Sequence, residues 1–485
     1  MYHGNKIVLL PWSLCCIFMQ SEYKNFLLNV VYQVLTFIFP LFTIPYISRI
    51  LGVDNVGIYS YTYSIVNMFI LLGMLGLNNY GNREIAKVRD NKLELSKCFC
   101  SIYGLQLVVN ISAIICYIVY LSLFCTEYKA IAILQMIYLI SILFDVNWFY
   151  FGMEKFKMTI TRNLIIKVLS IIFIFTLIKG KNDLWIYTII IALSTLLSQL
   201  YLFINLPKFV DFKIPFFKGI SKHLKSVVLL FIPVLAYSIY RVMDKIMIGS
   251  LSSMFELGNY ENAEKLINIP IAIITALGTV MLPRMAYLFA NQQANVKQVI
   301  FNSMNLILLL STILSFGLFL ISEEISLLLF GDAFTKSGLI IRCIAVTIII
   351  SAWANVIRTQ LIIPRGYDTI YVKSTIGGAL VNVLFNVILI PLYGALGACV
   401  GTVLAELYVM IYQSIICRNE LELKKYFNLL LKYSLHSALI VTVAFVAAYK
   451  LENLFICLAV KIGISVLLFV IIERKYIWGT FLGRK

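Results

Sequence analysis

The sequence predicts an all-α, polytopic membrane protein with about fourteen transmembrane helices. Three observations predict this class: 61% of the 485 residues are hydrophobic, only 13% are charged, and the mean hydropathy is +0.92. Soluble domains contain roughly 45–50% apolar and about 25% charged residues. The chain therefore has no room for a large solvated domain, which excludes soluble enzymes and nucleic-acid-binding modules.

Runs of apolar residues define the predicted spans, because roughly 20 such residues in a helix cross the hydrocarbon core of a bilayer. Short polar segments separate one run from the next. The predicted spans are 26–50, 58–79, 99–124, 130–152, 163–178, 184–206, 226–251, 263–283, 300–322, 338–363, 371–392, 395–417, 433–449 and 454–472.

The distribution of Lys and Arg between the loops predicts the orientation of these spans. Cytoplasmic loops of membrane proteins are enriched in Lys and Arg. With a cytoplasmic N-terminus, most loop cations fall on the cytoplasmic side, and much of the net charge of +17 is explained. The opposite side then carries only Arg49, Lys129, Lys179, Lys181, Lys336 and Lys450. This asymmetry predicts an even number of spans and places both termini in the cytoplasm.

The longest predicted cytoplasmic link, residues 207–225, contains two prolines and five lysines and divides the chain into two halves. At an offset of 201 residues the halves share a glycine, a tyrosine and an arginine, namely Gly57, Tyr59, Arg83 and Gly258, Tyr260, Arg284. We therefore expect two six-helix lobes and two further helices. The predicted units are a leader (1–25), an N-terminal lobe (26–206), the linker (207–225), a C-terminal lobe (226–417) and a C-terminal segment with the last two spans and the tail (418–485).

Several charged residues fall at or near membrane depth. A charge at the bilayer centre costs about 2.5–3.5 kcal/mol on insertion scales, so such side chains should face a cavity or an ion pair. Snorkelling explains Lys167 and Lys265, which lie near span ends. Buried structural pairs, such as Asp244 beside Arg241, are an alternative for the others. We predict a cationic, substrate-binding cavity that contains Arg241, Lys245, Arg342, Arg358 and Arg49.

Motifs of catalysis are absent from the sequence: it contains no Walker A motif, no His-Glu-x-x-His and no Cys-x-x-Cys. The three histidines are scattered, so they predict no metal site. A basic cavity in a largely uncharged bundle suits an anionic substrate. We therefore expect a transporter rather than an enzyme, and no cofactor other than a coupling ion.

Two stretches of the sequence resemble polysaccharide exporters and O-unit flippases of the Wzx type, in the superfamily of the lipid II flippases and the MATE multidrug exporters. The first comprises residues 45–60 with Gly76-Leu77 and residues 82–86; the second comprises residues 244–249 and 257–260. The resemblance implies two six-helix lobes around a central cavity. It also implies a bacterial inner-membrane location and the flipping of undecaprenyl-diphosphate-linked oligosaccharide from the cytoplasmic to the periplasmic leaflet.

The same resemblance implies contacts with membrane lipids, and with polysaccharide polymerase and chain-length proteins as partners. The first span has no arginine between Asn29 and Pro45, whereas lipid II flippases carry arginines there, which counts against lipid II as the cargo. A MATE-like multidrug or cation antiporter and a membrane polysaccharide polymerase are the alternatives. The antiporter should have an acidic cavity, and the polymerase should have a large extracytoplasmic loop.

A polar set in the C-terminal half resembles the sodium site of some lipid II flippases in spacing and residue type. Hard cations such as Na⁺ prefer oxygen ligands. One carboxylate, two amides, one hydroxyl and one backbone carbonyl would supply them, from Asp244, Asn382, Asn386, Thr402 and Ala398. A polar cluster that only packs the helices is the structural alternative. The functional alternative is proton coupling through Asp244, Glu406 or Asp145. Burial raises the pKa of a carboxyl group, which lets it take up and release a proton near neutral pH.

Overall fold

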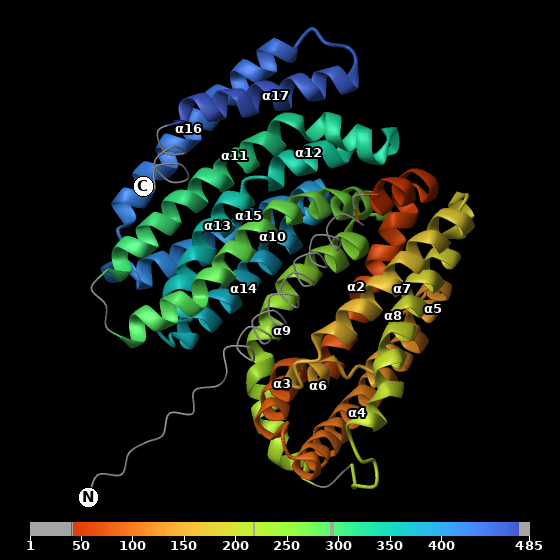
Figure 1. Cartoon of the computed structure of the whole chain (residues 1–485). Helices are drawn as coiled ribbons and strands as arrows, with labels where there is room; N and C mark the ends of the chain where they lie inside the picture. Colours follow the sequence, from red (N-terminus) through yellow and green to blue (C-terminus); the bar gives the residue numbers. More distant parts are fainter. Residues whose placement is uncertain (1–39, 41, 217–218, 292–294, 475–485) are drawn as a thin grey trace, which may run out of the picture.

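The computed structural model describes residues 40, 42–216, 219–291 and 295–474, and every regular element within these ranges is a helix. This confirms the predicted all-α class. Figure 1 shows the helices as two groups that lie side by side. The main helices are α2 (Val53–Met74), α3 (Leu77–Val88), α4 (Lys92–Leu123), α5 (Lys129–Leu143), α6 (Asn147–Gly152), α7 (Phe156–Leu177), α8 (Leu184–Asn205), α9 (Ile220–Leu251), α10 (Met254–Ala290), α11 (Val296–Phe330), α12 (Thr335–Ile344), α13 (Thr347–Ile357), α14 (Asp368–Tyr393), α15 (Ala395–Ile416), α16 (Leu423–Ala448) and α17 (Leu454–Ile472).

Within the described residues, eleven helical segments are long and apolar enough to cross a membrane, and a bent helix pair raises this number to twelve. The chain is thus a multi-pass membrane protein, as predicted, whereas the exact number of fourteen spans stays a prediction. The first predicted span, 26–50, lies largely outside the described residues. The seventh, 226–251, coincides with α9.

The predicted span 338–363 is not one straight helix, because α12 and α13 meet at an angle of 43°. At this bend the Thr347 hydroxyl donates a hydrogen bond to the Ile344 carbonyl over 2.6 Å, and Ser315 of α11 donates one to the Ala345 carbonyl over 2.8 Å. Side-chain hydroxyls that bond to backbone carbonyls in this way compete with the helical ladder and bend it. The bend is therefore encoded by polar side chains rather than by apolar periodicity.

The first helical group consists of α2–α8 and the second of α9–α15, while α16 and α17 pack outside the second group against α11 (Figure 1). Helix α2 packs on α4 and α5 and also on α10 of the second group. Helix α9 packs chiefly on α14 and touches α2, α3 and α4. The two groups resemble the predicted lobes, although the predicted domain boundaries themselves stay a prediction.

The contact between α2 and α10 brings together the two glycines that correspond in the predicted repeat. A Cβ atom on Gly57 would lie 2.0 Å from the Met254 carbonyl oxygen, and one on Gly258 would lie 2.0 Å from the Val53 carbonyl oxygen. Only glycine permits so close an approach of two helix backbones. The two repeat-related positions therefore form a reciprocal contact at the end of the molecule where the groups meet.

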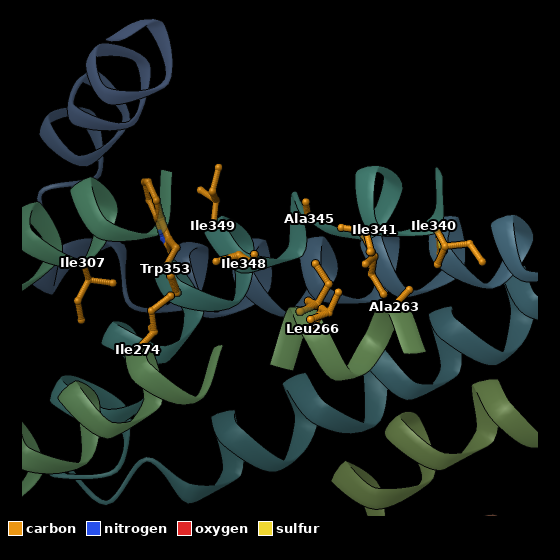
Figure 2. Close-up of a cluster of buried hydrophobic side chains, with 14 of the residues drawn as sticks. Ala263, Leu266, Ile274, Ile307, Ile340, Ile341, Ala345, Ile348, Ile349 and Trp353 are labelled. Carbon is orange, nitrogen blue, oxygen red and sulfur yellow. The ribbon is translucent and has the colours of Figure 1, made fainter. Parts of the chain in front are cut away.

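Buried aliphatic side chains hold the second group together. Figure 2 shows Leu266 and Ala263 of α10 beside Ile341 of α12, with Trp353 of α13 further along the same layer. All belong to one cluster of buried side chains, and the Trp353 indole also donates to the Ser414 hydroxyl of α15 over 3.0 Å. Close packing of this kind, rather than the hydrophobic effect, stabilises helix contacts inside a membrane.

Candidate functional site

Four helices of the second group converge on one buried carboxylate. Asp244 of α9 is 3% exposed. Its carboxylate accepts hydrogen bonds from the Tyr260 hydroxyl at 2.9 Å, the Asn386 amide at 2.6 Å and the Thr402 hydroxyl at 2.7 Å. The same Asn386 amide donates to Oδ1 of Asn382 over 3.2 Å. The structure therefore brings Asp244, Asn382, Asn386 and Thr402 together, and it adds Tyr260, which sequence reasoning missed.

This Asp244 cluster contains two polar atoms that have no hydrogen-bond partner, Nδ2 of Asn382 and Oδ1 of Asn386. Nearly all buried polar atoms in proteins have a partner, either a protein group or an ordered water. In the described arrangement Asn386 turns its donor toward Asp244, so a cation would require this amide to rotate and offer its oxygen. The arrangement described is a hydrogen-bonded carboxylate.

Helix α15 supplies the space for the cluster. A Cβ atom on Gly401 would lie 2.2 Å from Oδ1 of Asn386, so any side chain there would displace the amide. Ala398, whose backbone carbonyl was predicted as a ligand, is buried in the same helix one turn before Thr402. The lack of a side chain at Gly401 therefore makes room for Asn386.

Lys245 lies beside carboxylates. Its ammonium is 2.7 Å from Glu261 and 2.8 Å from Glu264, and Glu261 also lies 3.1 Å from the Lys265 ammonium. Arg241 donates to Asn268 over 2.5 Å and lies 3.7 Å from Glu264. In the alternative that placed Asp244 beside Arg241, the two were a buried pair; in the structure the carboxylate recorded beside Arg241 is that of Glu264. Sequence reasoning overlooked Glu261, which falls just before the predicted span 263–283.

Glu261 also links the two helical groups. The Ser60 hydroxyl of α2 donates to its carboxylate over 2.6 Å, and the next residue, Asn262, donates to the Ser48 hydroxyl over 2.8 Å. Ser60 and Glu261 are themselves 201 residues apart. The Ser60–Glu261 bond joins the same helix pair, α2 and α10, as the reciprocal glycine contact, and Ser48 lies in the segment just before α2. One end of the interface between the groups is therefore closed by polar bonds and by backbone packing.

A cavity of about 250 Å³ in the second group is lined by Arg241, Arg358 and Glu406 together with Tyr371. The Arg358 guanidinium lies 6.0 Å from the centre of the Tyr371 ring. Two of the predicted cavity arginines therefore share one cavity, which we name the arginine cavity. Glu406, predicted as a proton site, faces the same space, so the cavity is not purely cationic.

The other predicted cavity residues lie elsewhere. Arg342 pairs with Glu323 at 2.8 Å and donates to the Ser322 hydroxyl, and Arg49 donates to the Leu328 carbonyl over 2.6 Å. Both side chains thus contact α11, and neither lines the arginine cavity. Arg342 occupies the last turn of α12 directly beside α11, which places its guanidinium within reach of a carboxylate. For Arg342 the structure shows an ion pair with an exposed carboxylate rather than a place in the arginine cavity.

Asp145, the third predicted proton site, belongs to the first group. Its carboxylate accepts from the backbone N–H of Asn147 at 3.0 Å and from the Asn147 side chain at 2.7 Å. Both bonds hold the first residue of α6. Arg162, predicted as a cytoplasmic loop cation, is instead 5% exposed inside this group.

Comparison with known proteins supplies the family. Residues 23–289, more than half of the chain, match the family described as polysaccharide biosynthesis protein. The chain belongs to this family. Its membership confirms the resemblance predicted from residues 45–60 and 244–249.

Two curated bacterial relatives of this family member are similar over most of their length. A protein of Shigella dysenteriae described as a candidate O-antigen transporter is 25% identical over 80% of this chain and 98% of its own length. One of Escherichia coli K12 with the same description is 21% identical over 82% of this chain and 96% of its own length.

Solved structures show that the fold is shared more widely. An inward closed conformation of the lipid II flippase MurJ superposes with a TM-score of 0.74 at 18% identity, covering 93% of this chain and all of that one. An inward-facing MATE multidrug transporter gives a TM-score of 0.63 at 15% identity, over 81% of this chain and 94% of that one. At these identities the likeness concerns the fold.

Proposed function

We propose that the protein flips an undecaprenyl-diphosphate-linked oligosaccharide from the cytoplasmic to the periplasmic leaflet of a bacterial inner membrane. One observation carries the proposal: Arg241 and Arg358 line a cavity within a membrane-embedded bundle. The two bacterial relatives described as candidate O-antigen transporters, which align along nearly their whole length, support the same cargo class. These relatives also favour a transporter over an enzyme.

The chemistry of the arginine cavity suits a diphosphate. Phosphate groups cannot enter hydrocarbon, because a buried charge without a partner is costly. Guanidinium groups bind phosphate through paired, charge-assisted hydrogen bonds and stay charged at any physiological pH. A lipid-linked substrate would place its diphosphate at Arg241 and Arg358 and leave its polyprenyl chain in the bilayer.

Alternating access follows from the reciprocal contact between α2 and α10. In the proposed orientation this contact lies at the periplasmic end, so the described conformation is closed toward the periplasm. Opening would separate Gly57 from Met254 and Gly258 from Val53, and it would break the bond from Ser60 to Glu261. These bonds join two rigid helical groups, so their loss would allow the groups to rock about the cavity.

The coupling ion belongs to the proposal as well. The Asp244 cluster offers a buried carboxylate, amide and hydroxyl oxygens, among them the unpartnered Oδ1 of Asn386, a set that suits Na⁺. Proton coupling through Asp244 or Glu406 is the alternative. Asp145 is a weaker candidate, because its carboxylate already accepts two hydrogen bonds from Asn147. Polysaccharide polymerase and chain-length proteins remain proposed partners, and both termini are proposed to be cytoplasmic.

A multidrug exporter is the second candidate, favoured by the MATE-like fold and by Glu406 in the arginine cavity. Two arginines in the same cavity repel cationic drugs, which is why we prefer the anionic cargo.

Deletion of the gene in a cell that carries it distinguishes the flippase from the multidrug exporter. Lipid-linked oligosaccharide should accumulate and react with lectin in inverted but not in right-side-out vesicles, and a plasmid copy should reverse this. Unchanged oligosaccharide levels together with new drug sensitivity would support the exporter instead.

A further inference from the structure

Two helices of the first group are interrupted, and the interruptions lie close together. Between α2 and α3, Leu75 and Gly76 have φ of 42° and 78°, in the left-handed region. Between α5 and α6, the chain leaves the helix after Leu143 and re-enters it at Asn147. Each helix pair counts as one span by length and apolarity, and α3 packs on α6. Non-helical backbone at membrane depth is tolerated where it is buried or lines a cavity.

The interruption between α5 and α6 is a built structure with its own hydrogen bonds. The Gln106 side chain of α4 donates to the carbonyls of Ile142 and Asp145 over 3.0 and 2.8 Å, and it accepts from the Trp148 indole at 2.9 Å. These bonds satisfy backbone groups that the missing helical turn leaves open. The break is thereby fixed in place, which is what a binding surface requires.

A cavity of about 710 Å³ lies against this region, between α3, α6, α7 and α8. Its volume falls in the range of roughly 300–1,000 Å³ typical of ligand pockets. Arg162 and Lys167 line it, and its lining contains no carboxylate among the described residues. Six carboxamide side chains line it as well, namely Asn78, Asn79, Asn82, Asn147, Asn163 and Gln199. We name this cavity the amide pocket.

Arg162 organises the amide pocket. Its guanidinium donates to the Ser198 carbonyl at 2.7 Å, to Oδ1 of Asn147 at 3.1 Å and to Oδ1 of Asn163 at 2.8 Å. It also lies 3.4 Å from Oε1 of Gln199, which accepts a second bond from Asn147. The carbonyl oxygens of these amides therefore turn toward the arginine. The N–H₂ group of Asn147 is itself directed at Asp145 and Gln199, so the amides of α3, rather than this one, offer donors to a ligand.

The pocket chemistry suits a polyhydroxylated ligand better than a free phosphate. Several of the donors of Arg162 are already directed at protein oxygens, which makes this buried cation a positioning group. Amides and hydroxyls that surround the remaining space bind ring hydroxyls and acetamido oxygens through many modest hydrogen bonds. On α3, Asn78, Asn79 and Asn82 are exposed although they follow a membrane-embedded helix, so they face a polar space.

We propose that the amide pocket binds the sugars of the cargo that are distal to the diphosphate, while the diphosphate lies at the arginine cavity of the second group. This inference rests on the proposed function. In this scheme the amides of the first helical group bind the sugars of the cargo. The arginines of the second helical group bind the diphosphate, which is common to all such lipids.

Protection of an introduced cysteine from a small thiol reagent tests the assignment. Asn79→Cys reports on the amide pocket, and Thr275→Cys, an exposed lining residue of the arginine cavity, is the matched control. Labelling at each position is read by peptide mass spectrometry, which separates it from labelling of the native cysteines. Inverted membranes come from cells that make the complete lipid-linked oligosaccharide, only the lipid diphosphate with its first sugar, or neither.

We expect position 79 to lose labelling only in membranes with the complete oligosaccharide, and position 275 to lose it with either lipid. Equal labelling of position 79 in all three membranes, with position 275 protected, would overturn the sugar site and leave the proposed function intact. Equal protection of position 79 by both lipids would also overturn it. Full labelling of both positions in every membrane would count against the proposed function itself.

Arg162→Lys tests the positioning role. Lysine keeps the charge but cannot hold three oxygens with a planar fork. In the double variant Asn79→Cys/Arg162→Lys, position 79 should no longer be protected by the complete oligosaccharide. In the double variant Thr275→Cys/Arg162→Lys, position 275 should stay protected. Arg89→Lys, in the exposed pair with Glu154, is the matched control and should leave both unchanged. If position 79 stays protected in the Arg162→Lys protein, the positioning role proposed for Arg162 is wrong.

Discussion

The two helical groups bury positive charge in different ways. In the second group, Lys245 lies within 2.8 Å of two carboxylates, so the charge is neutralised and fixed. In the first group, Arg162 donates to backbone and amide oxygens, so its positive charge is solvated by neutral groups. A neutralised cation joins helices, whereas a cation held by amides leaves a polar and positive surface. The comparison separates the parts that hold the groups together from the parts that face a ligand.

The largest expected effect comes from removing the neutralised cation. Lys245→Ala leaves Glu261 and Glu264 side by side, and breaking a buried ion pair costs about 3–5 kcal/mol. We expect a marked loss of thermal stability of the purified protein in detergent. Lys425→Ala, which removes an exposed pair with Glu422, should change stability by no more than about 1 kcal/mol. Equal losses for the two variants would show that the carboxylates find other partners.

The Asp244 cluster was predicted from its resemblance to the sodium site of some lipid II flippases; periodicity adds only that Asn382 and Asn386, and likewise Ala398 and Thr402, lie one turn apart on their own helices. Sequence reasoning assigned Arg162 to a loop and Lys245 to an open cavity, because charge partners on other helices cannot be read from one segment. Glu261 and the carbonyls of Ser198 and Leu328 enter only through tertiary packing. Helix class and spans follow from local apolarity, whereas the environment of each charge does not.

The next effect concerns the Asp244 cluster and tests whether the second group also contains an ion site. Asp244→Asn keeps the shape of the side chain but removes the charge that a cation needs. We expect stimulation of transport by an imposed sodium gradient, roughly tenfold if the coupling is about 1.4 kcal/mol, to disappear. Transport is measured in vesicles at fixed pH and membrane potential, with choline replacing sodium as the control. Stimulation that survives in Asp244→Asn would assign the coupling site elsewhere.

A smaller effect should separate Arg241 and Arg358, which line the arginine cavity, from Arg342, which does not. Arg241→Gln and Arg358→Gln each remove a charge-assisted bond to the diphosphate, worth about 1.5–3 kcal/mol. We expect each to lower transport at limiting substrate by roughly tenfold, since 1.4 kcal/mol corresponds to that factor. Arg342→Gln, which breaks the pair with Glu323, should leave transport near the original rate. The abundance of each variant in the membrane is quantified in parallel. A transport defect of Arg342→Gln as large as those of Arg241→Gln and Arg358→Gln would show that lining the cavity does not distinguish the arginines needed for transport.

The smallest effect tests the contact between the groups. Gly57→Ala places a Cβ atom against the Met254 carbonyl, and overpacking of this kind costs about 1–3 kcal/mol. We expect a shift of the conformational equilibrium away from the closed periplasmic end, seen as faster labelling of a cysteine introduced at Ser60. Gly317→Ala, where a Cβ atom meets nothing within 4 Å, is the control. Unchanged labelling in Gly57→Ala would mean that this contact does not close the interface.

Reconstituted flipping tests the central claim most directly. Undecaprenyl-diphosphate-linked trisaccharide with a radiolabelled terminal sugar is incorporated into both leaflets of proteoliposomes, and a glycosidase that cannot enter the vesicles is added outside. With the protein present, digestion should pass beyond the outer-leaflet fraction toward completion, and the Arg241→Gln/Arg358→Gln protein should slow this second phase. Digestion that stops at the same fraction in proteoliposomes and in protein-free liposomes, with a sodium gradient or a proton gradient applied, would contradict the account.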